Sequence, residues 1–157
     1  MNELMEINQG SWKLAASAMI LKNGKLEAYS TSQIRKIMGA ACSENFLEDI
    51  LKIFRGYKPA PPQDQNPSQA QWQIRKKAQK NRDFGNLLVE IIKNQDFYFV
   101  QKLLRYTIWN IRIIENNKAE LSKIELILDC EGVNDKQEIL GLIKPIFGAS
   151  KTQDYRR

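Results

Sequence analysis

The segment at residues 96–115 combines cationic and aromatic side chains in a pattern that suits a nucleic-acid strand. At about 100° per residue of an α-helix, five of these side chains fall on one narrow line, here called the basic-aromatic stripe: Tyr98, Lys102, Arg105, Trp109 and Arg112. Guanidinium groups bind phosphate, and a Trp or Tyr ring stacks on a base or packs against ribose. The alternative is that the two rings only widen the contact with the core, while the cations extend past them into solvent.

The other side of the same predicted helix is apolar. Its members share one broad face and are expected to pack inward: Phe97, Val100, Leu103, Leu104, Thr107, Ile108, Ile111 and Ile114. The segment is therefore predicted to be a helix with a core face and a charged face of different chemistry.

A second basic cluster lies at residues 75–82, close to Trp72. It holds five cations within eight residues, namely Arg75, Lys76, Lys77, Lys80 and Arg82. Because like charges in about two helical turns repel one another, a phosphate backbone would stabilise them and displace their counterions. The alternative is a solvated helix face that only aids solubility.

Composition favours binding over catalysis. The net charge of +6 and the pI near 9.3 favour acidic partners such as nucleic acid. The chain has no histidine, which removes the commonest zinc ligand and the residue best suited to proton transfer near neutral pH. Acids such as Glu48, Asp49, Glu90 and Glu125 are scattered at solvent-facing helical positions, and no glycine-rich phosphate loop is present. We expect no enzymatic activity, no cofactor and no metal.

Cysteine use and hydropathy indicate the compartment. Cys42 and Cys130 lie in apolar helical patterns without CxxC spacing, so both are predicted to be reduced core residues. No segment approaches the roughly eighteen apolar residues of a membrane span, and the N-terminal acids do not fit a secretory signal. We expect a cytoplasmic protein.

Positioning the two basic clusters requires helices along most of the chain. Strand signals are nearly absent, and apolar residues recur at three- and four-residue spacing from Trp12 to Phe147. The sequence therefore predicts an all-α fold, a compact helical bundle of about five to seven helices in a single domain, 1–157, whose length allows a real core. The expected helices are 11–21, 31–41, 43–54, 68–93, 96–115, 119–130 and 134–147.

Local signals fix the expected ends of these helices. Ser30 and Gln33 have capping-box spacing at the start of the 31–41 helix, with Thr31 as the alternative cap. Asp96 is expected to cap the 96–115 helix. The 134–147 helix repeats the capping-box spacing at its start and is expected to stop at Gly148. Four of the five prolines lie at 59–67, so a proline-rich loop is predicted at 57–68 and a flexible tail at 149–157.

The string STSQIRKIM at residues 30–38 resembles the signature near the start of the small subunit of type III-A CRISPR effector complexes, in which T-S-Q-I-R opens the first conserved helix. Helix capping alone accounts for the Ser and the Gln but not for the whole string. Residues 91–112 are similar in style to the last long helix of that family. The similarity runs from Thr31 to about Arg112, and the chain departs from the family in its proline-rich loop and its extra C-terminal helices.

The resemblance implies a helical subunit that stacks in several copies along a ribonucleoprotein filament and catalyses nothing. Its implied partners are guide RNA, target RNA, other effector-complex subunits and further copies of itself, and its role is antiviral defence. Arg35 and Lys36 are carried over from the motif as candidate nucleic-acid contacts. Backbone contact without base readout is expected, because guide–target pairing supplies the sequence information. The alternative function is a helical protein–protein adaptor with a basic surface and no nucleic-acid role.

Overall fold

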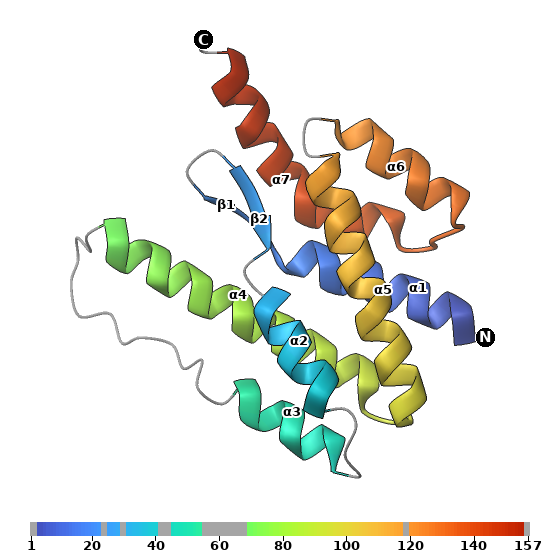
Figure 1. The fold of residues 1–157 in the computed structure, drawn as a ribbon. Helices are drawn as coiled ribbons and strands as arrows, with labels where there is room; N and C mark the ends of the chain where they lie inside the picture. Colours follow the sequence, from blue (N-terminus) through green and yellow to red (C-terminus); the bar gives the residue numbers. More distant parts are fainter. Residues whose placement is uncertain are drawn as a thin grey trace.

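The structure, a computed structural model, describes residues 3–22, 25–28, 31–40, 45–54, 69–117 and 120–155 of the chain. These residues form seven helices and one β-hairpin (Figure 1). The elements in order are α1 (Glu3–Ser17), β1 (Met19–Lys22), β2 (Lys25–Ala28), α2 (Thr31–Ala40), α3 (Phe46–Phe54), α4 (Gln69–Ile92), α5 (Phe97–Asn116), α6 (Leu121–Cys130) and α7 (Lys136–Tyr155). The predicted all-α class and the number of helices are confirmed.

The packing of α5 against α1 forms the centre of the fold. Figure 1 shows α5 crossing in front of α1, while α4 and α7 also contact α1. Gly10 of α1 makes the close approach possible, because a Cβ atom there would lie 3.1 Å from Leu103 Cδ1 of α5 and 3.3 Å from Ile91 Cγ2 of α4. Trp12 and Leu14 of α1 are fully buried and belong to the same core cluster as Leu103 of α5. The core therefore holds α5 by one face along most of its length.

The remaining elements pack around this centre. The helix α2 contacts α5 and α3, and α3 in turn contacts α4; Ile34, Ile37 and Ile50 are their buried residues. On the other side α6 pairs with α7, which also contacts the hairpin and α1. None of the described helices is long and apolar enough to cross a membrane.

Polar contacts fix the orientation of α1 inside this packing. Asn110 of α5 donates a hydrogen bond from Nδ2 to Ser11 Oγ over 3.0 Å, and both side chains are buried. Trp12 Nε1 donates to a carboxylate oxygen of Glu131 at 2.6 Å. Lys13 Nζ lies 2.9 Å from an Asp135 carboxylate oxygen, and this hydrogen bond raises the pKa of Lys13. Directional contacts thus join α1 to α5 and to the segment between α6 and α7.

The expected cap of α5 is confirmed. Asp96 has extended backbone angles, φ −82° and ψ 172°, and its side chain accepts a hydrogen bond from the Phe99 N–H at 2.9 Å. The cap expected at residue 134 is wrong, because α7 begins at Lys136 and its first turn bonds back to the Asp135 carbonyl. The cap expected at Ser30 lies outside the described residues, as do the proline-rich loop predicted at 57–68 and Cys42.

The hairpin was not predicted, and it ends the first helix earlier than expected. Its two strands pair antiparallel from Met19 with Ala28 to Lys22 with Lys25. Each strand has four residues, a length at which an apolar run does not separate helix from strand. The sequence signal was the Asn-Gly pair between them, a dipeptide typical of two-residue hairpin loops.

Two further expectations are wrong. The helix α7 continues past Gly148 to Tyr155, so the predicted flexible tail at 149–157 is helical in its described part. A glycine inside a helix costs only about 1 kcal/mol relative to alanine, which does not force an end. Cys130 is exposed rather than buried, because the core face of α6 is formed by Ile124 and Leu128, and residue 130 points elsewhere on the helix.

Candidate nucleic-acid interface

The basic-aromatic stripe lies on the outer face of α5. Tyr98 is 67% exposed and Trp109 is 51% exposed, and the three cations of the stripe are exposed as well. The opposite face is buried at Val100, Leu103, Leu104, Thr107, Ile111 and Ile114, as expected. The alternative in which both rings mainly serve the core does not fit these exposures. Packing on α1 therefore leaves the whole stripe on the surface.

The cations of the stripe are not neutralised by the described part of the chain. No described carboxylate forms an ion pair with Lys102, Arg105 or Arg112, whereas described ion pairs do occur at Lys13, Lys123 and Lys136. The last of these joins α6 to α7: Lys136 Nζ lies 2.8 Å from Asp129, and this hydrogen bond raises the pKa of Lys136. Within the described residues, the positive charge of the stripe is therefore not paired, which suits it to an external anion.

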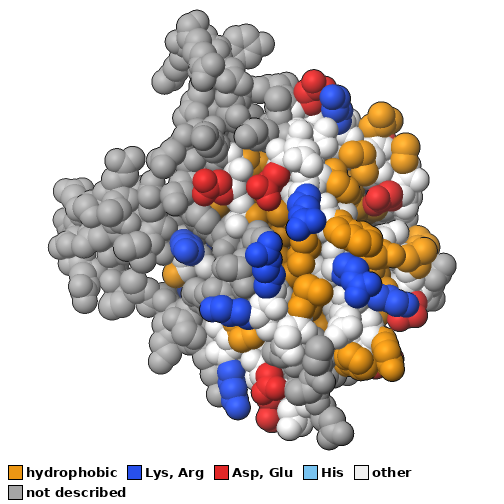
Figure 2. Space-filling model, in the orientation of Figure 1, with side chains coloured by type: hydrophobic (Ala, Val, Ile, Leu, Met, Phe, Trp, Pro, Cys, Tyr) orange, Lys and Arg blue, Asp and Glu red, His pale blue; other side chains and the backbone are white. Residues whose placement is uncertain are grey.

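The helix α2 adds its cations on the same side of the molecule. Arg35 and Lys36 are exposed, while Ile34 and Ile37 beside them are buried under α2. Figure 2 shows Lys and Arg side chains in a band across the middle of this face, over α5, α2 and the neighbouring part of α4, with acidic side chains mostly above and below the band. The structure thus brings the motif at residues 31–38 and the stripe onto one face.

The 75–82 cluster lies on α4, and two of its three described cations are less exposed than those of the stripe. Lys77 is exposed, Lys80 and Arg82 are half-buried, and the side chains of Arg75 and Lys76 lie outside the described residues. The Arg82 guanidinium donates to Gln79 Oε1, and Gln79 in turn donates to Asp83 Oδ1 at 2.7 Å. The helix itself therefore holds Arg82, which makes this side chain a weaker phosphate ligand than those of the stripe.

A groove opens beside the stripe, between the first two turns of α1 and the middle of α5. This α1–α5 groove has a volume of about 330 Å³ and is lined by Glu3, Leu4, Ile7, Lys102, Arg105, Tyr106 and Trp109. The rings of Tyr106 and Trp109 stack, with centroids 5.3 Å apart and planes inclined by 22°. Tyr106 was not among the binding residues predicted from the sequence. Its three-residue spacing from Trp109 was the signal that the two rings would meet.

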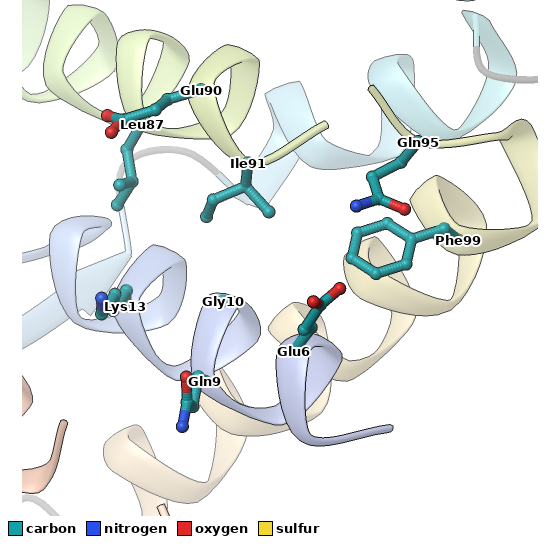
Figure 3. A pocket seen from close by; sticks show the side chains of 9 residues that line it. All are labelled: Glu6, Gln9, Gly10, Lys13, Leu87, Glu90, Ile91, Gln95 and Phe99. Atoms are coloured by element: carbon teal, nitrogen blue, oxygen red, sulfur yellow. The ribbon is translucent and has the colours of Figure 1, made fainter. Parts of the chain in front are cut away.

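A second cleft lies between α1, α4 and the start of α5, and its lining includes the carboxylates of Glu6 and Glu90. Its volume is about 340 Å³, and Figure 3 shows Leu87 and Ile91 pointing from α4 toward α1, with the Glu6 carboxylate beside the Phe99 ring. Glu6 and Glu90 make this cleft unsuitable for phosphate. The described residues contain no group of carboxylates and cysteines arranged to hold a metal ion.

No protein-family model, curated protein or solved structure matches this chain. The similarity of residues 30–38 to the CRISPR small subunit therefore stays a prediction. We infer function from the surface described above.

Proposed function

We propose that this protein is a non-catalytic RNA-binding subunit that holds the phosphate backbone along the basic-aromatic stripe. The observation that carries the proposal is the line of exposed cations on α5 without an ion pair among the described residues. The opposite face of α5 is buried in the core, so the cations sit on a rigid support. Rigid support lowers the entropic cost of binding a charged strand.

The dimensions of the surface suit a polyanion. At 1.5 Å per residue, Lys102 and Arg112 lie about 15 Å apart along α5, which is long enough to contact several successive phosphates. Arg35 and Lys36 of α2 are exposed, and Figure 2 shows basic side chains over α2 on the face where α5 lies. Lysine and arginine bind phosphate through its charge, so these contacts do not depend on the base sequence of the strand.

The finer proposal is a divergent small subunit of a type III-A CRISPR effector complex, located in the cytoplasm. Two observations support it: α2 begins at Thr31, where the similarity begins, and the motif cations Arg35 and Lys36 are exposed. In such a complex guide–target pairing reads the sequence, and a subunit that binds only the backbone suffices. Its partners are guide RNA, target RNA, neighbouring subunits and further copies of this chain.

A protein–protein adaptor is the second candidate. Leu126 on α6 and Leu142 on α7 are 63% and 40% exposed, and exposed large apolar residues favour contact with another protein. In this case the stripe would meet an acidic protein surface. The same leucines are equally suited to packing against a neighbouring subunit of a ribonucleoprotein.

The two candidates differ in what the stripe binds. The double variant Arg105→Ala/Arg112→Ala should keep the helicity and melting temperature of the native chain, because both side chains are exposed. Its affinity for RNA should fall by roughly five- to thirty-fold, since an exposed ionic contact contributes up to about 1 kcal/mol. The control Lys123→Ala/Lys144→Ala removes two exposed charges from α6 and α7 and should bind normally. Equal binding by both variants and the native chain would contradict the assignment.

A further inference from the structure

We infer that the α1–α5 groove takes one unstacked base from a single-stranded RNA whose phosphates lie on the basic-aromatic stripe. The inference rests on the proposed function and adds the state of the RNA: single-stranded, with one base turned into the protein. It follows from the residues of the groove, which differ in chemistry from one wall to the other.

The aromatic wall is a ready stacking platform. Trp109 is half-exposed, and the half-buried Tyr106 ring stacks against it within α5, which holds the indole in place. A nucleobase that joins this stack gains contact with a ring that is already ordered. Base–aromatic stacking tolerates any of the four bases, because each has a π-face.

The charges around the groove set the direction of the nucleotide. Lys102 and Arg105 belong both to the groove and to the stripe, so a phosphate at the α5 rim meets two cations. On the α1 wall, Leu4 and Ile7 are apolar and Glu3 is acidic. A phosphate is repelled from that wall, whereas a neutral base has apolar contacts there. The phosphate therefore stays at the rim and the base points inward.

The groove suits an unpaired base rather than a paired one. About 330 Å³ lies at the small end of ligand sites, enough for one planar group. In an A-form duplex the bases are stacked on one another and paired, so no base face is available to Trp109. The Asp and Glu side chains of an acidic peptide would pair with the cations but have no flat ring to continue the Tyr106–Trp109 stack. The stacked pair is the reason to favour a nucleotide.

The test compares two variants at one position with the native chain. Trp109→Leu removes the ring and keeps an apolar side chain, whereas Trp109→Phe keeps an aromatic face. Binding is measured by fluorescence anisotropy with three labelled probes: a single-stranded oligouridylate of about twelve nucleotides, the same backbone without bases, and an RNA duplex of equal length. Thermal melting by circular dichroism checks the fold of each variant.

The native chain should bind the oligouridylate more tightly than the abasic strand. Trp109→Leu should weaken oligouridylate binding by roughly five- to 150-fold and leave the abasic and duplex affinities unchanged, while Trp109→Phe should retain most of the affinity. Equal losses for all three probes, or none, would overturn the base-binding groove. So would an oligoglutamate peptide that competes as well as the oligouridylate.

The outcome separates this inference from the function on which it rests. If Trp109→Leu has no effect specific to the single strand while Arg105→Ala/Arg112→Ala still weakens every RNA probe, the groove is wrong and backbone binding stands. If neither variant changes binding, both are wrong.

Discussion

The buried hydrogen bond between Ser11 and Asn110 joins α1 to α5, and its loss should measurably destabilise the support of the stripe. The Ser11 hydroxyl donates to the Asn8 carbonyl and accepts from Asn110 Nδ2, each over 3.0 Å. Ser11→Ala removes the acceptor and leaves the Asn110 amide buried without it. An unsatisfied buried donor costs about 1–3 kcal/mol.

The net effect on stability is smaller than this cost. Alanine is the better helix former and offsets about 0.5 kcal/mol of the loss, so unfolding should become easier by about 0.5–2.5 kcal/mol. In a chain of this length that corresponds to a fall of roughly 1–10 °C in Tm. Urea denaturation followed by circular dichroism gives the free energy of unfolding directly.

A double-mutant cycle separates the hydrogen bond from other effects. Asn110→Ala in the Ser11→Ala background removes the orphaned amide, so the double variant should lose less than the sum of the single losses. Ser122→Ala, at an exposed position of α6, is the matched control and should change stability by less than about 0.5 kcal/mol. Additive losses, or a Ser11→Ala variant as stable as the control, would refute the reasoning.

Two further predictions concern stability. Asp96→Ala should lower the free energy of unfolding by about 0.5–2 kcal/mol, because the Phe99 N–H loses its partner; an unchanged urea midpoint would show that α5 does not need this cap. Lys13 has a pKa above 10.5 in the folded chain because of its hydrogen bond with Asp135. Its contribution is therefore complete below pH 10.5 and is lost as the pH rises through the raised pKa. The stability difference between the native chain and Lys13→Met should be constant at neutral pH and shrink above pH 10.5; a difference that grows there would contradict the ion pair.

The sequence was sufficient for α5 because its signals are local and agree with one another. Asp96 lies at the correct position for a cap, and seven apolar side chains together with Thr107 recur with the helical period along this helix of twenty residues. The period that buries one face also determines which side chains remain outside. Periodicity put Tyr98 and Trp109 outside the core face but left open whether their rings widen the core contact, and their exposed fractions of 67% and 51% decide this point.

The α1–α5 groove could not be predicted from the periodicity of one helix. One wall comes from Glu3, Leu4 and Ile7, about a hundred residues before the other wall. Periodicity within one helix says which face is buried but not which distant helix covers it. The same limit applies to the hydrogen bond between Trp12 and Glu131, 119 residues apart in sequence.

Short elements and chain ends were predicted less well. The strand at 19–22 continues the apolar pattern of the helix expected at 11–21, whereas the strand at 25–28 lies in a segment for which no helix was expected. The Asn-Gly pair between them was the signal for a hairpin. Gly148 and Cys130 show that one residue type is weak evidence by itself. Glycine ends a helix only where the following packing favours an end, and a cysteine near a helix terminus follows the face on which it lies.

The dependence of RNA affinity on salt concentration tests the central claim most directly. For single strands the slope of log K against log[salt] is about −0.7 per phosphate contact. The three cations of the stripe therefore predict a slope of about −2 or steeper for the native chain, and Arg105→Ala/Arg112→Ala should reduce its magnitude by about 1.4. A slope near zero, or one that the double variant leaves unchanged, would contradict a phosphate-binding stripe on α5.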